Sequence, residues 1–197
     1  MQTETPWQSD LDHLNWLSLA KLDNFSGKQI LDLGCGSGYV CQKAMEQGAQ
    51  RVVGIDIIKP KLAESGKFDF QIANLDASDW HESIQGDFDL IFAFDILEHL
   101  ASPFWFLSSC HQKLKANGIL VLTTPNCLSW ERFYKPNNWS GVQDPQHKTL
   151  FTKYSLKFML EKSGFNQNSI KAPMRALGFL GPLQPQIGGQ ILVKASR

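Results

Sequence analysis

The stretch ILDLGCGSGYV, residues 30–40, decides the fold of this chain. An apolar run typical of a buried strand leads directly into three glycines at alternate positions, Gly34, Gly36 and Gly38, and a helical pattern follows. Glycine at a strand-to-helix turn permits positive φ angles and lets a ligand approach the backbone closely. The stretch therefore predicts a ligand site at the carboxyl end of a buried strand.

The spacing of these glycines favours a nucleoside ligand over a dinucleotide or a simple phosphate. The order here is G-x-G-x-G, whereas the dinucleotide fingerprint is G-x-G-x-x-G and the phosphate loop needs G-x-x-x-x-G-K followed by Ser or Thr. Asp32, just before the glycines, would repel a pyrophosphate but suits a ligand that carries an ammonium group. A tight turn without any ligand is the structural alternative.

Two further carboxylates follow the next strands. Asp56 ends the run VVGID, where a carboxylate can accept both hydroxyl hydrogens of a ribose. Asp76 lies in NLDASDW beside the small Ala77, and its carboxylate suits an adenine amino group. A helix cap or a solvated loop charge is the alternative interpretation of Asp76. With the glycine turn, these acids outline a site for a nucleoside with a positively charged substituent.

Apolar periodicity predicts alternating strands and helices. Short apolar runs indicate strands, and patterns of helical period that end at glycine or begin at Thr152 indicate helices. We expect strands at residues 29–33, 51–55, 68–72, 88–92, 119–123, 168–172 and 190–195, and helices at residues 10–25, 37–48, 60–65, 103–115 and 152–163. Such alternation is typical of an α/β, doubly wound, mainly parallel sheet with helices on both faces.

The length of 197 residues suits a single domain. We expect an N-terminal helical cap at residues 1–27 and an α/β domain at residues 28–197, with residues 130–150 and 173–189 as loops on the ligand side. Aromatic side chains in the first loop could wall a substrate pocket or pack on the sheet edge: Trp130, Phe133, Tyr134 and Trp139. Apolar side chains in the second could bind an apolar molecule or be buried by the N-terminal helix: Leu177, Phe179, Leu180 and Leu183.

Composition excludes several other classes. Nineteen basic and nineteen acidic residues leave no net charge, which disfavours a nucleic-acid partner. The polar, acidic start and the lack of a run as long as a membrane span predict a cytoplasmic protein. The four cysteines show no C-x-x-C pair and no His/Cys cluster at metal spacing, so we expect reduced thiols and no metal site.

Five blocks, ILDLGCGSG, VVGID, NLDASDW, GDFDLIFAFDILEHL and LKANGILVLTTPN, together resemble the successive motifs of the class I S-adenosylmethionine-dependent methyltransferases. The resemblance covers residues 28–126 and extends more weakly to residue 165. It implies a seven-stranded sheet of order 3-2-1-4-5-7-6 with an antiparallel last strand. Within that family, the DILEHL block and the small size are most similar to small-molecule enzymes, including the ubiquinone-biosynthesis type that methylates oxygen.

By this resemblance the cofactor is S-adenosyl-L-methionine, which leaves as S-adenosyl-L-homocysteine. The methionine part would lie against Asp32 and the glycine turn, the ribose against Asp56, and the adenine against Asp76 and Ala77. The residues implied for the cofactor are Asp32, Gly34, Cys35, Gly36, Gly38, Asp56, Ile57, Asp76, Ala77, Phe94 and Asp95.

Methyl transfer from a sulfonium needs alignment of donor and acceptor rather than a metal, but an oxygen acceptor must lose its proton. His99, after the fourth strand, and His147, at the end of the aromatic loop, are the candidate bases. Either one can instead be a structural hydrogen-bonding residue, and Glu98 fits the start of a helix. We expect the remaining histidines, His13, His81 and His111, to lie away from the strand ends.

The acceptor is best interpreted as a small molecule, with apolar and lipid-linked molecules among the candidates. An N-P-P-Y motif for nucleobase amino groups is absent after the fourth strand, and clustered cysteines for zinc-assisted thiol methylation are absent too. Two other functions stay open: a catalytically inactive S-adenosylmethionine-binding regulatory or partner protein, and, with less support, an NAD-dependent oxidoreductase.

Overall fold

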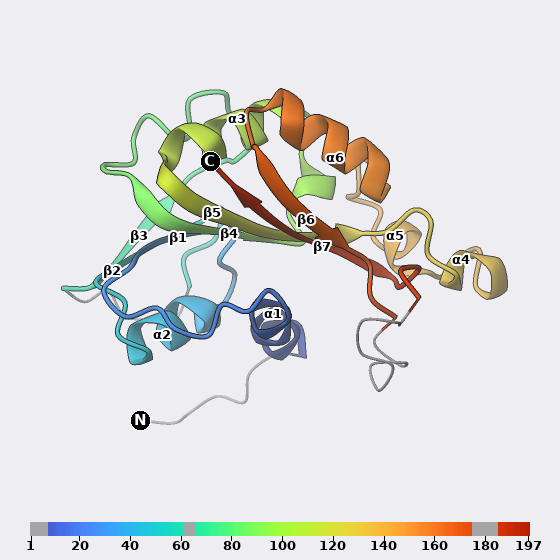
Figure 1. The fold of residues 1–197 in the computed structure, drawn as a ribbon, viewed down its shortest axis with the longest axis horizontal. Helices are drawn as coiled ribbons and strands as arrows, with labels where there is room; N and C mark the ends of the chain where they lie inside the picture. Colours follow the sequence, from blue (N-terminus) through green and yellow to red (C-terminus); the bar gives the residue numbers. More distant parts are fainter. Residues whose placement is uncertain (1–7, 61–65, 175–184) are drawn as a thin grey trace.

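One seven-stranded sheet runs through the molecule (Figure 1). The computed structural model describes residues 8–60, 66–174 and 185–197. The strand order is β3-β2-β1-β4-β5-β7-β6, and β7 runs antiparallel to both of its neighbours. Both features confirm the expected topology. The strands are β1 (Gln29–Leu33), β2 (Arg51–Asp56), β3 (Phe68–Ile72), β4 (Phe88–Phe94), β5 (Leu114–Pro125), β6 (Gln167–Lys171) and β7 (Gln190–Ser196).

Helices cover both faces of this sheet (Figure 1). The central strands β1, β2 and β4 are buried almost throughout, as near-continuous apolar runs between two helical layers must be. One core cluster joins the sheet to Leu107 of α3 and Leu160 of α6, and the other joins it to Trp16 of α1 and Ala44 of α2. The helices are α1 (Gln8–Leu19), α2 (Tyr39–Glu46), η1 (Leu97–His99, a 3-10 turn), α3 (Pro103–Lys113), α4 (Glu131–Tyr134), α5 (Ser140–Gln143) and α6 (Lys153–Lys162).

The first helix ends earlier than the apolar pattern predicted. Lys21 adopts a left-handed φ of 57°, and the N–H of Leu22 donates to the carbonyl of Leu17 at 3.0 Å. This closing bond is typical of a helix C-terminus. The predicted end at residue 25 was therefore wrong, although Phe25 is buried in the same core cluster.

Two other segments differ markedly from the prediction. Residues 130–147 are not entirely irregular, because they contain the single-turn helices α4 and α5. Strand β5 begins at Leu114, well before the predicted residue 119, and its pairing with β4 shifts register between Phe88 and Leu90. The helix predicted at residues 60–65 lies outside the described residues except for residue 60. The apolar run of residues 177–183 lies entirely outside them.

Thr152 caps α6 as the sequence predicts. Its hydroxyl accepts the N–H of Ser155 at 3.0 Å, and the Ser155 hydroxyl accepts the N–H of Thr152 at 3.0 Å, which completes a capping box. The four cysteines are free thiols, as predicted. Within the part of the chain that the structure describes, every helix is too short or too polar to cross a membrane.

Candidate cofactor and acceptor site

The glycine turn, residues 34–38, is bonded to the end of the neighbouring strand. The N–H groups of Gly34 and Cys35 both donate to the carbonyl of Ile55, at 2.8 and 3.0 Å. Gly34 has a φ of 77°, and a Cβ added there would lie 2.1 Å from Cδ1 of Ile96. The N–H of Gly36 donates to Oδ2 of Asp56 at 2.8 Å. Bare backbone at Gly34 is thus required for the close approach of this turn to Ile96.

A cavity of about 580 Å³ opens at the carboxyl ends of β1, β2, β3 and β4. This is where open parallel sheets bind ligands, and the volume suits a small organic molecule. We call this space the main cavity. Its walls are formed by Gly34, Asp56, Ile57, Ala73, Asn74, Leu75, Asp76, Asp95, Ile96, His99, Leu100, Pro145, Gln146 and Lys148.

Five of the residues predicted for the cofactor line the main cavity: Gly34, Asp56, Ile57, Asp76 and Asp95. The Asp56 carboxylate is oriented by two backbone bonds, because Oδ2 accepts the N–H of Gly36 and Oδ1 accepts the N–H of Ile58 at 3.1 Å. Ala77 lines a separate, smaller cavity instead. Cys35, Gly36 and Gly38 shape the turn without lining the main cavity.

Asp32 and Phe94 lie deeper than their predicted contacts with a ligand would require. Asp32 is 3% exposed and accepts a hydrogen bond from the Cys41 thiol at 3.2 Å. The hydrogen bond with Cys35, burial and the Asp32 charge together raise the pKa of Cys41 well above its usual range. Phe94 is also buried, and neither residue is part of the main cavity wall.

Asp76 forms an ion pair that the sequence did not predict. Its Oδ2 lies 2.6 Å from Nζ of Lys148, and its Oδ1 accepts the N–H of Ala101 at 2.6 Å. Partial burial raises the pKa of Asp76, but Lys148 and the Ala101 N–H outweigh it and hold the pKa below its usual value. Lys148 is itself held by a bond from its N–H to the Glu98 carbonyl at 2.8 Å. No local motif marks Lys148 in the sequence.

Asp95 connects the end of β4 to the first helix. It has a left-handed φ of 51°, unusual for a residue other than glycine, and the Thr123 hydroxyl donates to its Oδ1 at 2.9 Å. His13 of α1 lies with Nε2 3.4 Å from the other carboxylate oxygen and stacks on Phe94 with ring centroids 4.8 Å apart. The expectation that His13 lies away from the strand ends was therefore wrong. Long-range packing of α1 brings it there.

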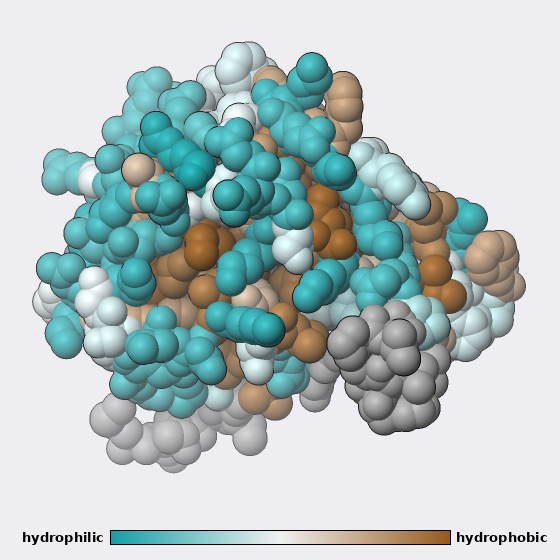
Figure 2. Space-filling model, viewed as in Figure 1, coloured by the Kyte–Doolittle hydropathy of each residue, from teal (hydrophilic) through white to brown (hydrophobic). Residues whose placement is uncertain are grey.

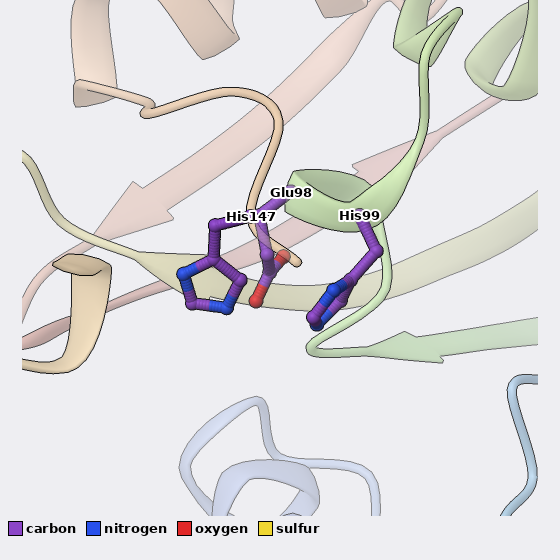
Figure 3. A group of neighbouring side chains, drawn as sticks. All are labelled: Glu98, His99 and His147. Carbon is purple, nitrogen blue, oxygen red and sulfur yellow. The ribbon is translucent and has the colours of Figure 1, made fainter. Parts of the chain in front are cut away.

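The two predicted catalytic histidines come together with Glu98 (Figure 3). One ligand atom from each of Glu98, His99 and His147 lies within 4.8 Å of the others, and the two imidazole rings are 4.7 Å apart. His99 lines the main cavity. We call these residues the three-residue cluster. It joins η1 to the end of the segment that carries α4 and α5.

Glu98 lies in the first turn of η1, as its position in the sequence suggests, and its side chain is buried. It is 1% exposed, and the Thr124 hydroxyl donates to its Oε2 at 2.8 Å. Burial, and then the nearby Asp95 charge, raise the pKa of Glu98 to about 8. Burial, followed by the neighbouring His147, lowers the pKa of His99 below its usual value.

A family model described as "Methyltransferase domain" matches residues 8–169, most of the chain. The chain belongs to the class I S-adenosylmethionine-dependent methyltransferases. S-adenosylmethionine is thus the cofactor of this methyltransferase, and the main cavity has the position in the fold where such a cofactor would bind.

Named relatives of the methyltransferase act on different acceptors. A ubiquinone biosynthesis O-methyltransferase of Bradyrhizobium sp. is 35% identical over 120 residues, which cover 57% of this chain and 45% of that protein. A tRNA U34 carboxymethyltransferase of Pseudomonas paraeruginosa is 34% identical over 133 residues, covering 63% and 39%. The chain thus spans less than half the length of either relative.

Solved structures support the fold of the methyltransferase. A S-adenosylmethionine-dependent methyltransferase from Archaeoglobus fulgidus superposes with a TM-score of 0.73 at 21% identity, and the match covers 96% of this chain and 95% of that one. The similarity extends over nearly the whole length of both chains. It agrees with the strand order observed here.

A second cavity, of about 330 Å³, adjoins residues 130–150 of the methyltransferase, which we call the aromatic segment. Trp130 and Tyr134 line it, with ring centroids 4.4 Å apart, and Trp16 of α1 also lines it. Figure 2 shows hydrophobic side chains at the end of the molecule where α4 and α5 lie in Figure 1, and Phe133 is 75% exposed there. Trp139, in contrast, is buried. The aromatic set is thus divided between a cavity, the core and the surface.

Proposed function

We propose that this methyltransferase transfers the methyl group of S-adenosylmethionine to an oxygen atom of a small molecule. The observation that carries the proposal is the main cavity, which has Asp56 and Asp76 on one part of its wall and Asp95 and His99 on another. A nucleoside with an attached amino acid needs carboxylate acceptors for its hydroxyl and amino hydrogens and room for a cationic sulfur.

The proposed cofactor position follows from these groups. The Asp56 carboxylate, oriented by Gly36 and Ile58, would accept the ribose hydroxyl hydrogens, with Ile57 against the adenine. Asp76, with Ala77 beside it, would accept the adenine amino group. The sulfonium would lie near Gly34 and Asp95, whose negative charge favours it. Asp32 would act through its charge behind the glycine turn rather than by direct contact.

The reaction is an in-line displacement at the methyl carbon. The acceptor oxygen forms a bond to that carbon, the carbon–sulfur bond breaks with its electron pair going to sulfur, and the acceptor hydroxyl loses its proton to His99 or His147. The products are the methyl ether and S-adenosylhomocysteine. Alignment of the two reactants in a site that excludes water supplies most of the rate enhancement that such a protein can give.

The acceptor is proposed to lie between the three-residue cluster and the second cavity. His147 Nδ1 is 3.1 Å from the carbonyl of Gly141, and the preceding Ser140 lines the second cavity, so the two places are adjacent. Trp130 and Tyr134 would contact the apolar part of the acceptor, and His99 and His147 its hydroxyl. The equal numbers of acidic and basic residues favour a small molecule over tRNA. A cytoplasmic location stays a prediction.

Calorimetric titration tests the cofactor part of this proposal. We expect S-adenosylmethionine and S-adenosylhomocysteine to bind at one site per chain with micromolar dissociation constants and NAD to give no heat. Asp56→Asn should weaken binding at least about tenfold because it removes a charge-assisted acceptor. Asp69→Asn, on the exposed part of β3, is the matched control. Binding of NAD alone would refute the proposal.

The catalytic part is tested with a set of hydroxylated metabolites. Release of S-adenosylhomocysteine with formation of a methyl ether is the expected result. A protein that binds the cofactor but releases no S-adenosylhomocysteine with any oxygen, nitrogen or carbon acceptor would instead favour the inactive, regulatory alternative.

A further inference from the structure

Among the residues that the structure describes, one buried polar atom of the three-residue cluster finds no partner. Oε1 of Glu98 has no hydrogen bond to any of them, although Glu98 is 1% exposed and its other oxygen accepts the Thr124 hydroxyl. Buried carboxylate oxygens are almost always bonded, so this atom calls for an explanation. Figure 3 shows the carboxylate directed between the rings of His99 and His147. The position that all three side chains face is therefore suited to a further group.

Backbone groups are hydrogen-bonded to both imidazoles. His147 Nδ1 is bonded to the carbonyl of Gly141 at 3.1 Å, which places the proton on Nδ1 and leaves the lone pair on Nε2. Figure 3 shows the Nε2 edge of that ring toward Glu98 and His99. His99 also has a backbone hydrogen bond with Gln146. A bond like that of His147 Nδ1, on the ring nitrogen that faces away from the cluster, orients histidine ligands in metal sites.

The charges around the cluster favour a cation. The carboxylates of Asp95 and Asp144 both interact with the charge of Glu98. The fold thus brings three acids, Asp95, Glu98 and Asp144, to this part of the molecule, and Lys148 is already paired with Asp76. A divalent cation would stabilise the ionised Glu98 and offset the repulsion among the three carboxylates.

We propose that Glu98, His99 and His147 bind a divalent transition-metal ion of the zinc type at the acceptor end of the main cavity. One carboxylate and two imidazoles are a ligand set of catalytic zinc sites, which keep a further coordination position open. Ligand atoms around such an ion are separated by roughly 3.3 Å, so the present spread of up to 4.8 Å would contract on binding. The sequence predicts no metal because His147 is far from Glu98 along the chain.

The catalytic use of the ion rests on the proposed function, but its binding does not. An acceptor hydroxyl in the open position would lose its proton to solvent water more readily, because a bound cation lowers the pKa of a coordinated oxygen. The resulting oxygen anion would attack the methyl carbon of S-adenosylmethionine as the carbon–sulfur bond breaks. The two histidines would then act as ligands rather than as proton acceptors.

Titration of the chelator-treated chain with Zn²⁺, followed by calorimetry, tests the site directly. We expect one Zn²⁺ per chain with a dissociation constant in the micromolar range or below. Glu98→Gln and His147→Gln should each weaken Zn²⁺ binding by more than about 10–100-fold, which is the effect of losing a residue that is only hydrogen-bonded to a metal ligand. The matched controls are Glu82→Gln and His81→Gln, which lie outside the cluster and should leave Zn²⁺ binding unchanged. No stoichiometric binding, or equal binding in all variants, would overturn the proposal.

X-ray absorption at the zinc edge is measured on the wild-type complex, so the result does not depend on whether any variant folds. Two imidazoles and a carboxylate predict nitrogen and oxygen neighbours at about 2.0–2.1 Å. Sulfur neighbours at about 2.3 Å would assign the ion to cysteines and refute the site. S-adenosylmethionine titrations on the chelator-treated chain separate the two proposals. If the chain binds the cofactor but not Zn²⁺, the proposed function stands and the metal site is refuted. If it binds Zn²⁺ but not the cofactor, the metal site stands and the proposed function is refuted.

Discussion

Lys148 and Asp76 form an ion pair of 2.6 Å on the wall of the main cavity, although 72 residues separate them in the chain. The pair joins the end of the aromatic segment to the loop after β3. Because Asp76 also accepts the Ala101 N–H, three separate segments meet at one carboxylate. This carboxylate is therefore expected to matter more for the cofactor than the lysine that contacts it.

Asp76→Asn should weaken S-adenosylmethionine binding by about tenfold, since it removes the charge from an acceptor at the proposed adenine position. Lys148→Met should change the affinity by less than about threefold, because half of its side chain is exposed and exposed ion pairs contribute about 0–1 kcal/mol. Calorimetry measures both variants, with Asp79→Asn as the control. Loss of binding in Lys148→Met with little change in Asp76→Asn would contradict this assignment.

Gly34→Ala should impair both folding and binding. The new Cβ would lie 2.1 Å from Ile96 Cδ1, at a residue whose φ of 77° is already unfavourable for a side chain. We expect a loss of about 1–3 kcal/mol in the free energy of unfolding. Urea denaturation measures the change. Gly66→Ala, where an added Cβ meets nothing within 4 Å, is the control and should be nearly neutral.

His13→Ala removes the stacking on Phe94 and the contact with Asp95. Because both partners lie at the end of β4, beside the proposed sulfonium position, S-adenosylmethionine binding should weaken severalfold while the helical content stays the same. Calorimetry and circular dichroism measure the two quantities. An affinity equal to that of the wild type would show that α1 has no part in holding the cofactor.

Asp89 should make the stability of the fold depend on pH in the acid range. Partial burial raises its pKa, but the Gln29 N–H at 2.8 Å and Lys115 Nζ at 2.9 Å outweigh it and lower the pKa below the usual value. A carboxylate whose pKa is lowered in the folded state stabilises the fold at pH values above the pKa that it has in the unfolded chain. This contribution is lost as the pH falls through the pKa of the folded state.

Asp89→Asn should therefore reduce the free energy of unfolding by about 1 kcal/mol at pH 7. The difference between variant and wild type should shrink as the pH is lowered below about 4. Urea denaturation at several pH values measures this difference, and Asp69→Asn in the exposed pair with Arg51 is the control. A difference that is constant from pH 7 to pH 3 would contradict the role given to Asp89.

Local patterns were sufficient for the sheet and for the position of the main cavity. The strand order was expected from the resemblance to the methyltransferase family. The alternation of strands and helices, the glycine turn at Gly34 and the carboxylates of Asp56 and Asp76 follow from apolar runs and from residues at strand ends. These features depend on neighbours in the chain, since a buried parallel strand has to be apolar on both faces and a tight turn has to lack side chains. Sequence reasoning finds such features because the cause lies within a few residues.

The contacts that give this site its chemistry were decided by tertiary structure alone. Packing of α1 brings His13 to Asp95, and the fold of the aromatic segment brings His147 to Glu98 and His99. Packing also turns the Asp32 carboxylate toward Cys41 instead of the main cavity. The sequence by itself determined the fold family and the cofactor, because these are encoded in local motifs. Only the folded chain joined side chains from distant segments, because their distances depend on how whole helices and loops pack on the sheet.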